Sequence, residues 1–193
     1  DATHVPVGDD QKQHLELCRD IAQRFNNDYK VENFFKAPEP LIQKQFSRIM
    51  SLKDGLKKMS KSEPSDLSRI NLTDNKDDII NKIKKAKTDS LPMPSTIDGL
   101  EDRAEAKNLL GIYSSLSETT LEKSIIEFSG KNFSEFKNSL VEVLVDKIIP
   151  ISVEIKKLLK EKKYLEKILL EGHKKANDIA SNKLKKIHEL VGF

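Results

Sequence analysis

In residues 75–87 and in almost all of the chain after residue 101, apolar residues recur every three to four positions, which is the spacing of amphipathic α-helices; residues 88–99 between them are expected to be a linker. Each apolar stripe covers one side of a helix and has to be buried against another element. The stripes include the sets Leu121, Ile125, Phe128; Phe136, Leu140, Val143, Leu144, Ile148; and Leu165, Ile168, Leu169, Ala176, Ile179, Ala180, Leu184, Ile187. The sequence therefore predicts a helical bundle in residues 74–193.

The first 73 residues have a mixed pattern. We expect short strands at His4–Gly8, Arg48–Leu52 and Ile70–Leu72, because β-branched and apolar residues there are bounded by turn formers. An amphipathic helix is predicted to end near Asn26, and Cys18 is expected to be buried in its apolar stripe of Leu15, Cys18, Ile21, Ala22 and Phe25. The proline-rich residues 31–42 are expected to form an irregular or extended connector.

Composition excludes several classes of protein. The 193 residues carry 34 Lys and Arg against 31 Asp and Glu, so a formal charge of +3 gives no argument for nucleic-acid binding by itself. A single cysteine excludes an internal disulfide framework, and we predict no metal site. No apolar run approaches the roughly 18 residues of a membrane span. We therefore expect a soluble protein of a reducing compartment without membrane association; the bacterial cytoplasm is the location we predict, with the mitochondrial matrix as the alternative.

The most informative segment for chemistry is Lys58-Met59-Ser60-Lys61-Ser62. Two lysines separated by small hydroxylic residues on a loop can surround a polyphosphate with ammonium, hydroxyl and backbone donors. Such donors stabilise the negative charge that develops on a phosphate leaving group. The alternative is a solvated Lys/Ser loop in a lysine-rich protein.

A second candidate segment is Gly8-Asp9-Asp10-Gln11, at the junction of the first strand and the first helix. A glycine there lets a ligand approach the backbone, and a carboxylate can bind a sugar diol at the start of a helix. Asp9 and Asp10 are also suitable residues for capping the helix, and this reading is the more common one.

Taken together and in order, these segments resemble the tryptophanyl-tRNA synthetase family. Lys58–Ser62 matches the second of two motifs shared by class I aminoacyl-tRNA synthetases, and the likeness continues through Ile70–Asp74, Asn108–Tyr113 and Gly172–Asn177. It implies an α/β fold, in which residues 1–73 are the C-terminal part of a Rossmann-type catalytic domain and residues 74–193 an α-helical anticodon-binding domain. The family's His-x-Gly-His-like motif is absent, so we expect the chain to be a C-terminal portion that is inactive alone.

The resemblance also implies roles for individual residues. Gly8, Asp9 and Asp10 would line the adenosine of ATP, with Asp10 on the ribose, and Gln11 would face the amino-acid substrate. Ile49 would lie against the adenine. The residues that would close over the triphosphate are Lys58, Met59, Ser60, Lys61 and Ser62.

The family reaction is attack of the tryptophan carboxylate on the α-phosphate of ATP, followed by transfer of the aminoacyl group to tRNA(Trp). Lys58 and Lys61 would be the catalytic residues, stabilising the departing pyrophosphate without acting as bases. Mg²⁺ would be bound through ATP and not by a dedicated protein site. The resemblance further implies L-tryptophan and tRNA(Trp) as partners and a homodimeric enzyme.

Two alternatives remain open at this point. Tyrosyl-tRNA synthetase is the nearest related enzyme, but its lysine loop usually departs from the sequence found here. A non-catalytic helical RNA-binding module could also keep the lysine loop without its chemistry. Residues 151–193 contain eleven lysines against six acidic residues, which suits contact with a tRNA stem or, more commonly, a solvated lysine face.

Overall fold

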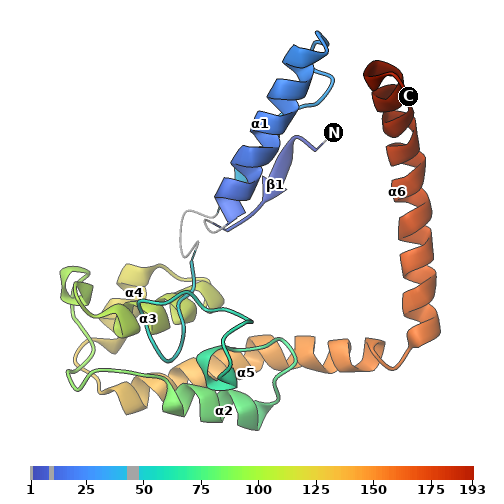
Figure 1. Ribbon diagram of the computed structural model, residues 1–193. Helices are drawn as coiled ribbons and strands as arrows, with labels where there is room; N and C mark the ends of the chain where they lie inside the picture. Colours follow the sequence, from blue (N-terminus) through green and yellow to red (C-terminus); the bar gives the residue numbers. More distant parts are fainter. Residues whose placement is uncertain (1, 9–10, 43–47) are drawn as a thin grey trace. The chain divides into compact units, whose positions relative to one another are not determined.

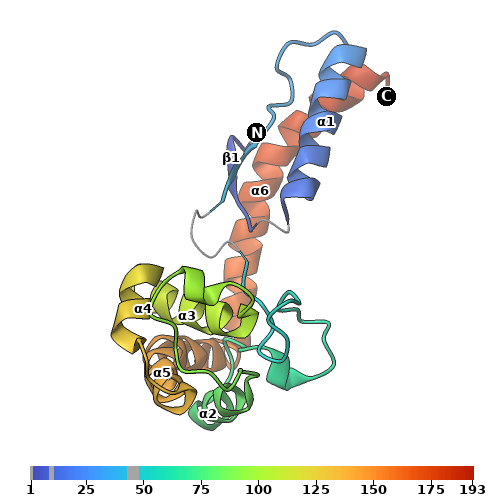
Figure 2. The same cartoon turned by 90° about the vertical axis from the view of Figure 1, so that its left-hand side faces the viewer.

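A computed structural model describes residues 2–8, 11–42 and 48–193, and its elements are drawn in Figures 1 and 2. The chain forms two compact units, one of Asp1–Gln43 with Leu158–Phe193 and one of Lys44–Lys157. We describe each unit by itself. No described helix combines the length and the apolar character needed to cross a membrane.

The first unit contains a small strand–helix–strand arrangement. Strand β1 (His4–Pro6) and strand β2 (Glu39–Leu41) pair in parallel, with Val5 opposite Pro40, and helix α1 (Lys12–Asp28) connects them. The predicted first strand and helix are therefore confirmed. The connector predicted over residues 31–42 contains β2, whose Pro40 is tolerated because a two-stranded ladder consists of edge strands only.

The face of α1 that contacts the rest of the unit differs from the predicted stripe. Leu15 and Ala22 are buried, Arg19 donates to the carbonyl oxygen of Pro38 at 3.1 Å, and Asn26 exchanges two hydrogen bonds with the backbone of Phe35. This set is spaced by three and four residues, as in any helix face, but it passes through Arg19 instead of Cys18. The prediction that Cys18 is buried is wrong, because its side chain is exposed.

Helix α6 (Lys162–Val191) is the longest helix of the first unit. It follows the predicted range, and it ends at Gly192, which adopts a left-handed conformation with φ of 94°. None of its residues is buried, so the predicted burial of its apolar stripe is wrong within the described part of the chain. Its Lys183 ammonium lies 4.0 Å from the ring centre of Phe34, a cation–π contact.

The second unit is mainly helical and contains the core of the described structure. Figures 1 and 2 show α2 (Lys76–Lys85), α3 (Ala104–Leu116) and α4 (Leu121–Phe128) gathered around the first part of α5 (Phe133–Leu158). A short 3₁₀ turn at Asp66–Ser68 precedes α2, and a second at Asp98–Leu100 lies between α2 and α3. The largest fully buried side chains are Phe128, Phe136, Leu52, Ile79, Ile83, Met93, Leu109, Leu110, Ile125 and Leu140. The predicted helices of residues 75–158 are thus confirmed.

Local sequence signals account for where these helices begin. Asn75 accepts a hydrogen bond from the backbone of Asp78, and the Asp78 carboxylate accepts one from the backbone of Asn75, a reciprocal capping box that starts α2. The Thr120 side chain accepts a hydrogen bond from the Lys123 amide and caps α4. Pro150 lies inside α5, which continues through it.

Two predicted strands are not formed in the second unit. Residues 48–52 make only an isolated antiparallel bridge between Met50 and Lys58, and residues 70–72 lead into a turn in which Asn71 accepts from the amide of Asp74. Leu52 is nevertheless buried in the same core as Ile79 of α2. The predicted division at residues 73 and 74 falls inside this unit, and it stays a prediction about function.

A buried ion cluster joins α2 to the segment before it. The Lys82 side chain is only 4% exposed, and its Nζ lies 2.6 Å from Asp74 Oδ2 and 2.7 Å from Asp66 Oδ2. Asn71 donates to both carboxylates, at 2.9 Å to Asp66 and 3.2 Å to Asp74. A hydrogen bond from Lys82 and a second from Asn71 lower the pKa of Asp66. These bonds compensate for moving the ammonium group out of water.

We expect Lys82→Met to lower the free energy of opening of α2 by about 3 to 5 kcal/mol, because the substitution leaves the buried Asp74 carboxylate without its cation. Hydrogen exchange of the Ile79 and Ile83 amides measures this quantity. The control is Lys85→Met on the same helix, where the side chain is exposed. Equal protection in the two variants would contradict the assignment.

Candidate functional site

A short hairpin base supports the segment Lys58–Ser62, which we call the lysine loop. The amide of Ser51 donates to the carbonyl oxygen of Lys57 at 2.8 Å, and the amide of Met59 donates to that of Ile49 at 3.0 Å. A turn between the two sides is closed by a hydrogen bond from the Lys57 amide to the Asp54 carbonyl oxygen at 3.0 Å. We call residues 49–51 with residues 57–59 the loop base, and the lysine loop leaves it at Lys58.

The lysine loop combines an anchored methionine with exposed lysines. Met59 is half-buried and packs against the core of the helical unit. The hydroxyl groups of Ser60 and Ser62 lie 2.8 Å apart, and the Ser62 amide also donates to Ser60 Oγ. Lys58 and Lys61 are exposed, and Lys61 makes no ion pair with any residue that the structure describes. The loop therefore presents cationic and hydroxyl donors on one anchored segment.

The structure brings Ile49 next to this loop. Its carbonyl oxygen accepts the Met59 amide, and its side chain is 45% exposed. An exposed isoleucine beside a cationic loop is a suitable apolar surface for a flat base. The predicted adenine-facing and triphosphate-facing residues thus share one hairpin.

The other predicted site residues belong to the first unit. Gly8 follows β1, and its carbonyl oxygen accepts the Gln11 amide at 3.0 Å, immediately before α1 begins. Gln11 is exposed. Asp9 and Asp10 lie outside the described residues. The meeting of Gly8 and Lys61 around one ATP molecule stays a prediction.

The turn of the hairpin rests on the start of α3. A Cβ atom at Gly55 would lie 2.6 Å from the backbone carbon of Ala104 and 2.7 Å from the backbone nitrogen of Glu105, so only glycine allows this approach. Glu105 also pairs with Lys87 at 2.8 Å. The hydrogen bond from Lys87 lowers the pKa of Glu105, and a hydrogen bond from the Leu56 amide lowers that of Asp54.

The far side of the lysine loop is held by Arg69. Its guanidinium donates to the carbonyl oxygen of Glu63 at 2.8 Å and pairs with Asp66 at 3.0 Å. Because Asp66 also pairs with Lys82, Arg69 links the buried ion cluster to Glu63, the residue that follows the lysine loop. The sequence analysis did not predict these supporting residues. A signal for them was present, because Lys82 and Asn108 are polar residues that interrupt the apolar faces of α2 and α3.

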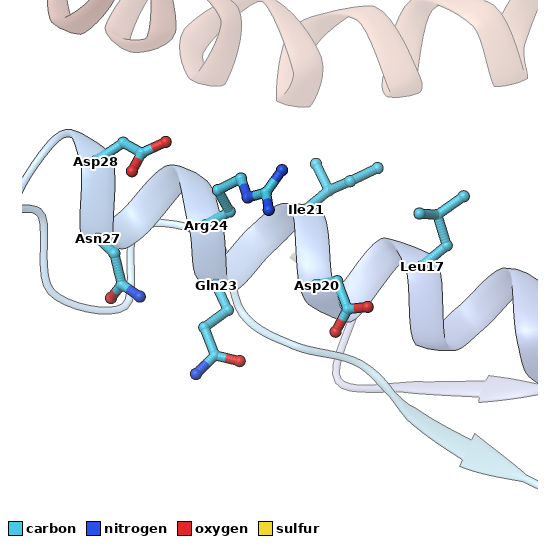
Figure 3. Close-up of a pocket in the computed structure, with 7 residues that line it drawn as sticks. All are labelled: Leu17, Asp20, Ile21, Gln23, Arg24, Asn27 and Asp28. Atoms are coloured by element: carbon cyan, nitrogen blue, oxygen red, sulfur yellow. The ribbon is translucent and has the colours of Figure 1, made fainter.

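Other features of the described chain do not compete with this site. A shallow hollow along α1 is lined by the residues of Figure 3, where Leu17 and Ile21 project from α1 away from β1 and β2. It includes none of the predicted site residues. The described residues contain no group of three or more His, Cys, Asp or Glu side chains arranged to hold a metal ion.

Comparison with known families gives a match to the model for tRNA synthetases class I (W and Y), over residues 1–146. A tryptophan–tRNA ligase of Caulobacter vibrioides is 51% identical over 192 residues, which cover 100% of this chain and 56% of that protein. The chain thus spans just over half the length of this relative.

Solved structures give the same picture. The tryptophanyl-tRNA synthetase of Mycoplasma pneumoniae matches with a TM-score of 0.81 and 31% identity, over 98% of this chain and 58% of that one. That of Campylobacter jejuni, solved in complex with ADP and tryptophan, matches with a TM-score of 0.68 and 27% identity, over 99% of this chain and 57% of the other.

We expect Gly55→Ala to destabilise the loop base by about 1 to 3 kcal/mol, because the added methyl group displaces the start of α3. Faster hydrogen exchange of the Lys57 and Met59 amides reports the effect. Gly172→Ala is the control, since nothing lies within 4 Å of a Cβ atom there. Unchanged exchange in Gly55→Ala would refute the close approach.

The hairpin turn should loosen in acid. Asp54 and Glu105 have lowered pKa values in the folded chain, so their contribution to stability is present above the ordinary carboxylate pKa of about 4 and is lost as the pH falls below it. Hydrogen exchange of the Leu56 and Lys57 amides, corrected for intrinsic rates, should show this step. The double variant Asp54→Asn, Glu105→Gln should lack it, and an equal step in that variant would sink the explanation.

Proposed function

The chain belongs to the class I tRNA synthetases of the tryptophan and tyrosine group, and from that membership we propose that it serves as the ATP-loop and helical portion of a tryptophan–tRNA ligase. The reaction is activation of tryptophan by ATP and transfer of the aminoacyl group to tRNA(Trp). The observation that carries the proposal is the lysine loop, which places Lys58, Lys61 and two serine hydroxyls on an anchored hairpin beside Ile49.

In this proposal the lysine loop acts on the triphosphate. When the tryptophan carboxylate attacks the α-phosphate, the bond to the bridging oxygen breaks and negative charge moves onto pyrophosphate. The ammonium groups of Lys58 and Lys61 would stabilise that charge, together with the Ser60 and Ser62 hydroxyls. Neither lysine has to accept a proton. Mg²⁺ enters with ATP as part of the substrate.

The first unit would supply the adenosine contacts. Gly8, Asp9 and Asp10 would line the adenosine, with Asp10 on the ribose, and Gln11 before the start of α1 would face the tryptophan. A backbone turn without a side chain at Gly8 permits close approach of a nucleotide, and the N-terminus of α1 favours negative charge. ADP and tryptophan are bound by the Campylobacter jejuni relative, which supports the substrate assignment.

The helical residues 74–193 would contact tRNA(Trp). Exposed lysines on α6 suit the phosphate backbone of a nucleic acid, which is bound largely through charge. Homodimer formation and a location in the bacterial cytoplasm stay predictions from the sequence. So does the division of labour between residues 1–73 and 74–193.

The test uses a chimaera in which this chain replaces the matching residues of the Caulobacter vibrioides relative. We expect tryptophan-dependent pyrophosphate exchange, and we expect Lys61→Ala to lower its rate by about 10² to 10³-fold, since one group that stabilises transition-state charge is removed. Lys53→Ala is the matched control, because Lys53 is exposed and lies outside the lysine loop. A full rate in Lys61→Ala would overturn the proposed role.

The same chimaera separates the enzyme from a binding module. Binding of tRNA without any exchange activity, in a chimaera whose parent is active, would favour a non-catalytic RNA-binding role.

A further inference from the structure

Asn108 is a buried polar residue on an otherwise apolar side of α3. Its side chain is 6% exposed, while Ala106, Leu109 and Leu110 beside it are almost fully buried. The Met50 amide donates to Asn108 Oδ1 at 2.9 Å, and Asn108 Nδ2 donates to the Met50 carbonyl oxygen at 2.8 Å. A single amide side chain therefore satisfies both backbone groups of one residue that is 58 positions away in the chain.

The geometry of the loop base explains why Met50 needs this partner. Met50 lies opposite Lys58, and the hydrogen bonds of the bridge are made by the residues on either side of this pair. In such an antiparallel pair, the amide and carbonyl groups of both residues point away from the partner strand. The Met50 groups thus point to α3, where Asn108 takes the position that a third strand would occupy.

Loss of this partner would leave two polar backbone groups without hydrogen bonds in a partly buried place. The base could then satisfy them only by shifting its register or by opening to water. Either change would move Lys58 and Met59, because both belong to the second side of the base. The buried neighbours of Asn108 fix the position of its amide, so the support is rigid.

We propose that Asn108 is a positioning residue for the lysine loop, which fixes the register of Met50 against Lys58 and thereby where Lys58, Met59 and Ile49 stand relative to ATP. The proposal rests on the proposed function of the lysine loop. Asn108 acts through the backbone of Met50 and has no direct contact with ATP. Its loss should weaken the use of ATP and leave the use of tryptophan unchanged.

The first test measures the loop base in the full 193-residue chain, without any substrate. In Asn108→Leu, the amides of Ser51 and Met59 should exchange at least about tenfold faster, since two hydrogen bonds next to them are lost. Ser114→Ala is the matched control, because Ser114 is also buried on α3 but donates only within its own helix, to Gly111 at 3.1 Å. Equal exchange in the two variants would overturn the proposal.

The second test uses Asn108→Asp, which has nearly the same shape. As a carboxylate it can accept from the Met50 amide but repels the Met50 carbonyl oxygen, whereas the protonated carboxyl can both accept and donate as the amide does. Burial raises the pKa of such a carboxyl towards the range of the assay. In the chimaera, the ratio of its kcat/KM for ATP to that of the unsubstituted protein should rise several-fold between pH 8 and pH 6.

The comparison also controls for other titrating groups. The charged neighbours Lys57 and Lys58 on the hairpin and Glu105 and Lys107 on α3 are present in both proteins, so the ratio reports the new carboxyl. KM for tryptophan should be the same in both. A ratio that does not change with pH, or an equal loss for tryptophan, would overturn the positioning role.

Failure of this inference differs from failure of the proposed function. If Lys61→Ala keeps full exchange activity, the lysine loop is not catalytic, and the proposed function falls together with the ATP readout. If Lys61→Ala is impaired while both Asn108 variants behave as Ser114→Ala does, the function stands and the inference about Asn108 is wrong.

Discussion

The hydrogen bonding of one extended segment, residues 49–52, underlies the geometry of the candidate site. Its backbone groups are taken up from several directions: residues 57–59 pair with one edge, Asn108 binds Met50, and Leu52 accepts from the Lys87 amide and donates to Ser68. A partly buried backbone has to find such partners within the protein. Because those partners lie just after α2, on α3 and in the 3₁₀ turn Asp66–Ser68, the hairpin that carries the lysine loop is fixed to the helical unit.

Charge is distributed in the second unit according to burial. Two cationic side chains with little exposure are neutralised, Lys82 by Asp74 and Asp66 and Arg103 by Asp89 at 2.7 Å. These pairs hold loops in place, since removing one partner from a buried pair is costly. Lys61, by contrast, is exposed and forms no ion pair within the described chain. Its charge is therefore available to a ligand, as the proposed chemistry requires.

The first unit shows how far a periodic pattern can be trusted. The spacing of the apolar residues correctly predicted that α1 and α6 are helices. It did not indicate which side of each helix contacts the rest of the unit. On α1 the contacting side follows Arg19 and Asn26, whose polar side chains bind the backbone of residues 35 and 38. Hydrogen bonds to a neighbouring loop thus determined the orientation, and Cys18 was left exposed.

The sequence by itself determined the helices, the caps at Asn75 and Thr120, the lysine loop and the family resemblance, because each depends on residues close together along the chain. The supports of the loop were decided only by the tertiary structure. Gly55 meets Ala104, and Met50 meets Asn108, across separations that no local pattern records. The expected strands at residues 48–52 and 70–72 failed for the same reason: Leu52 is buried in a helical core and Ile70 packs against it, and neither segment pairs in a sheet.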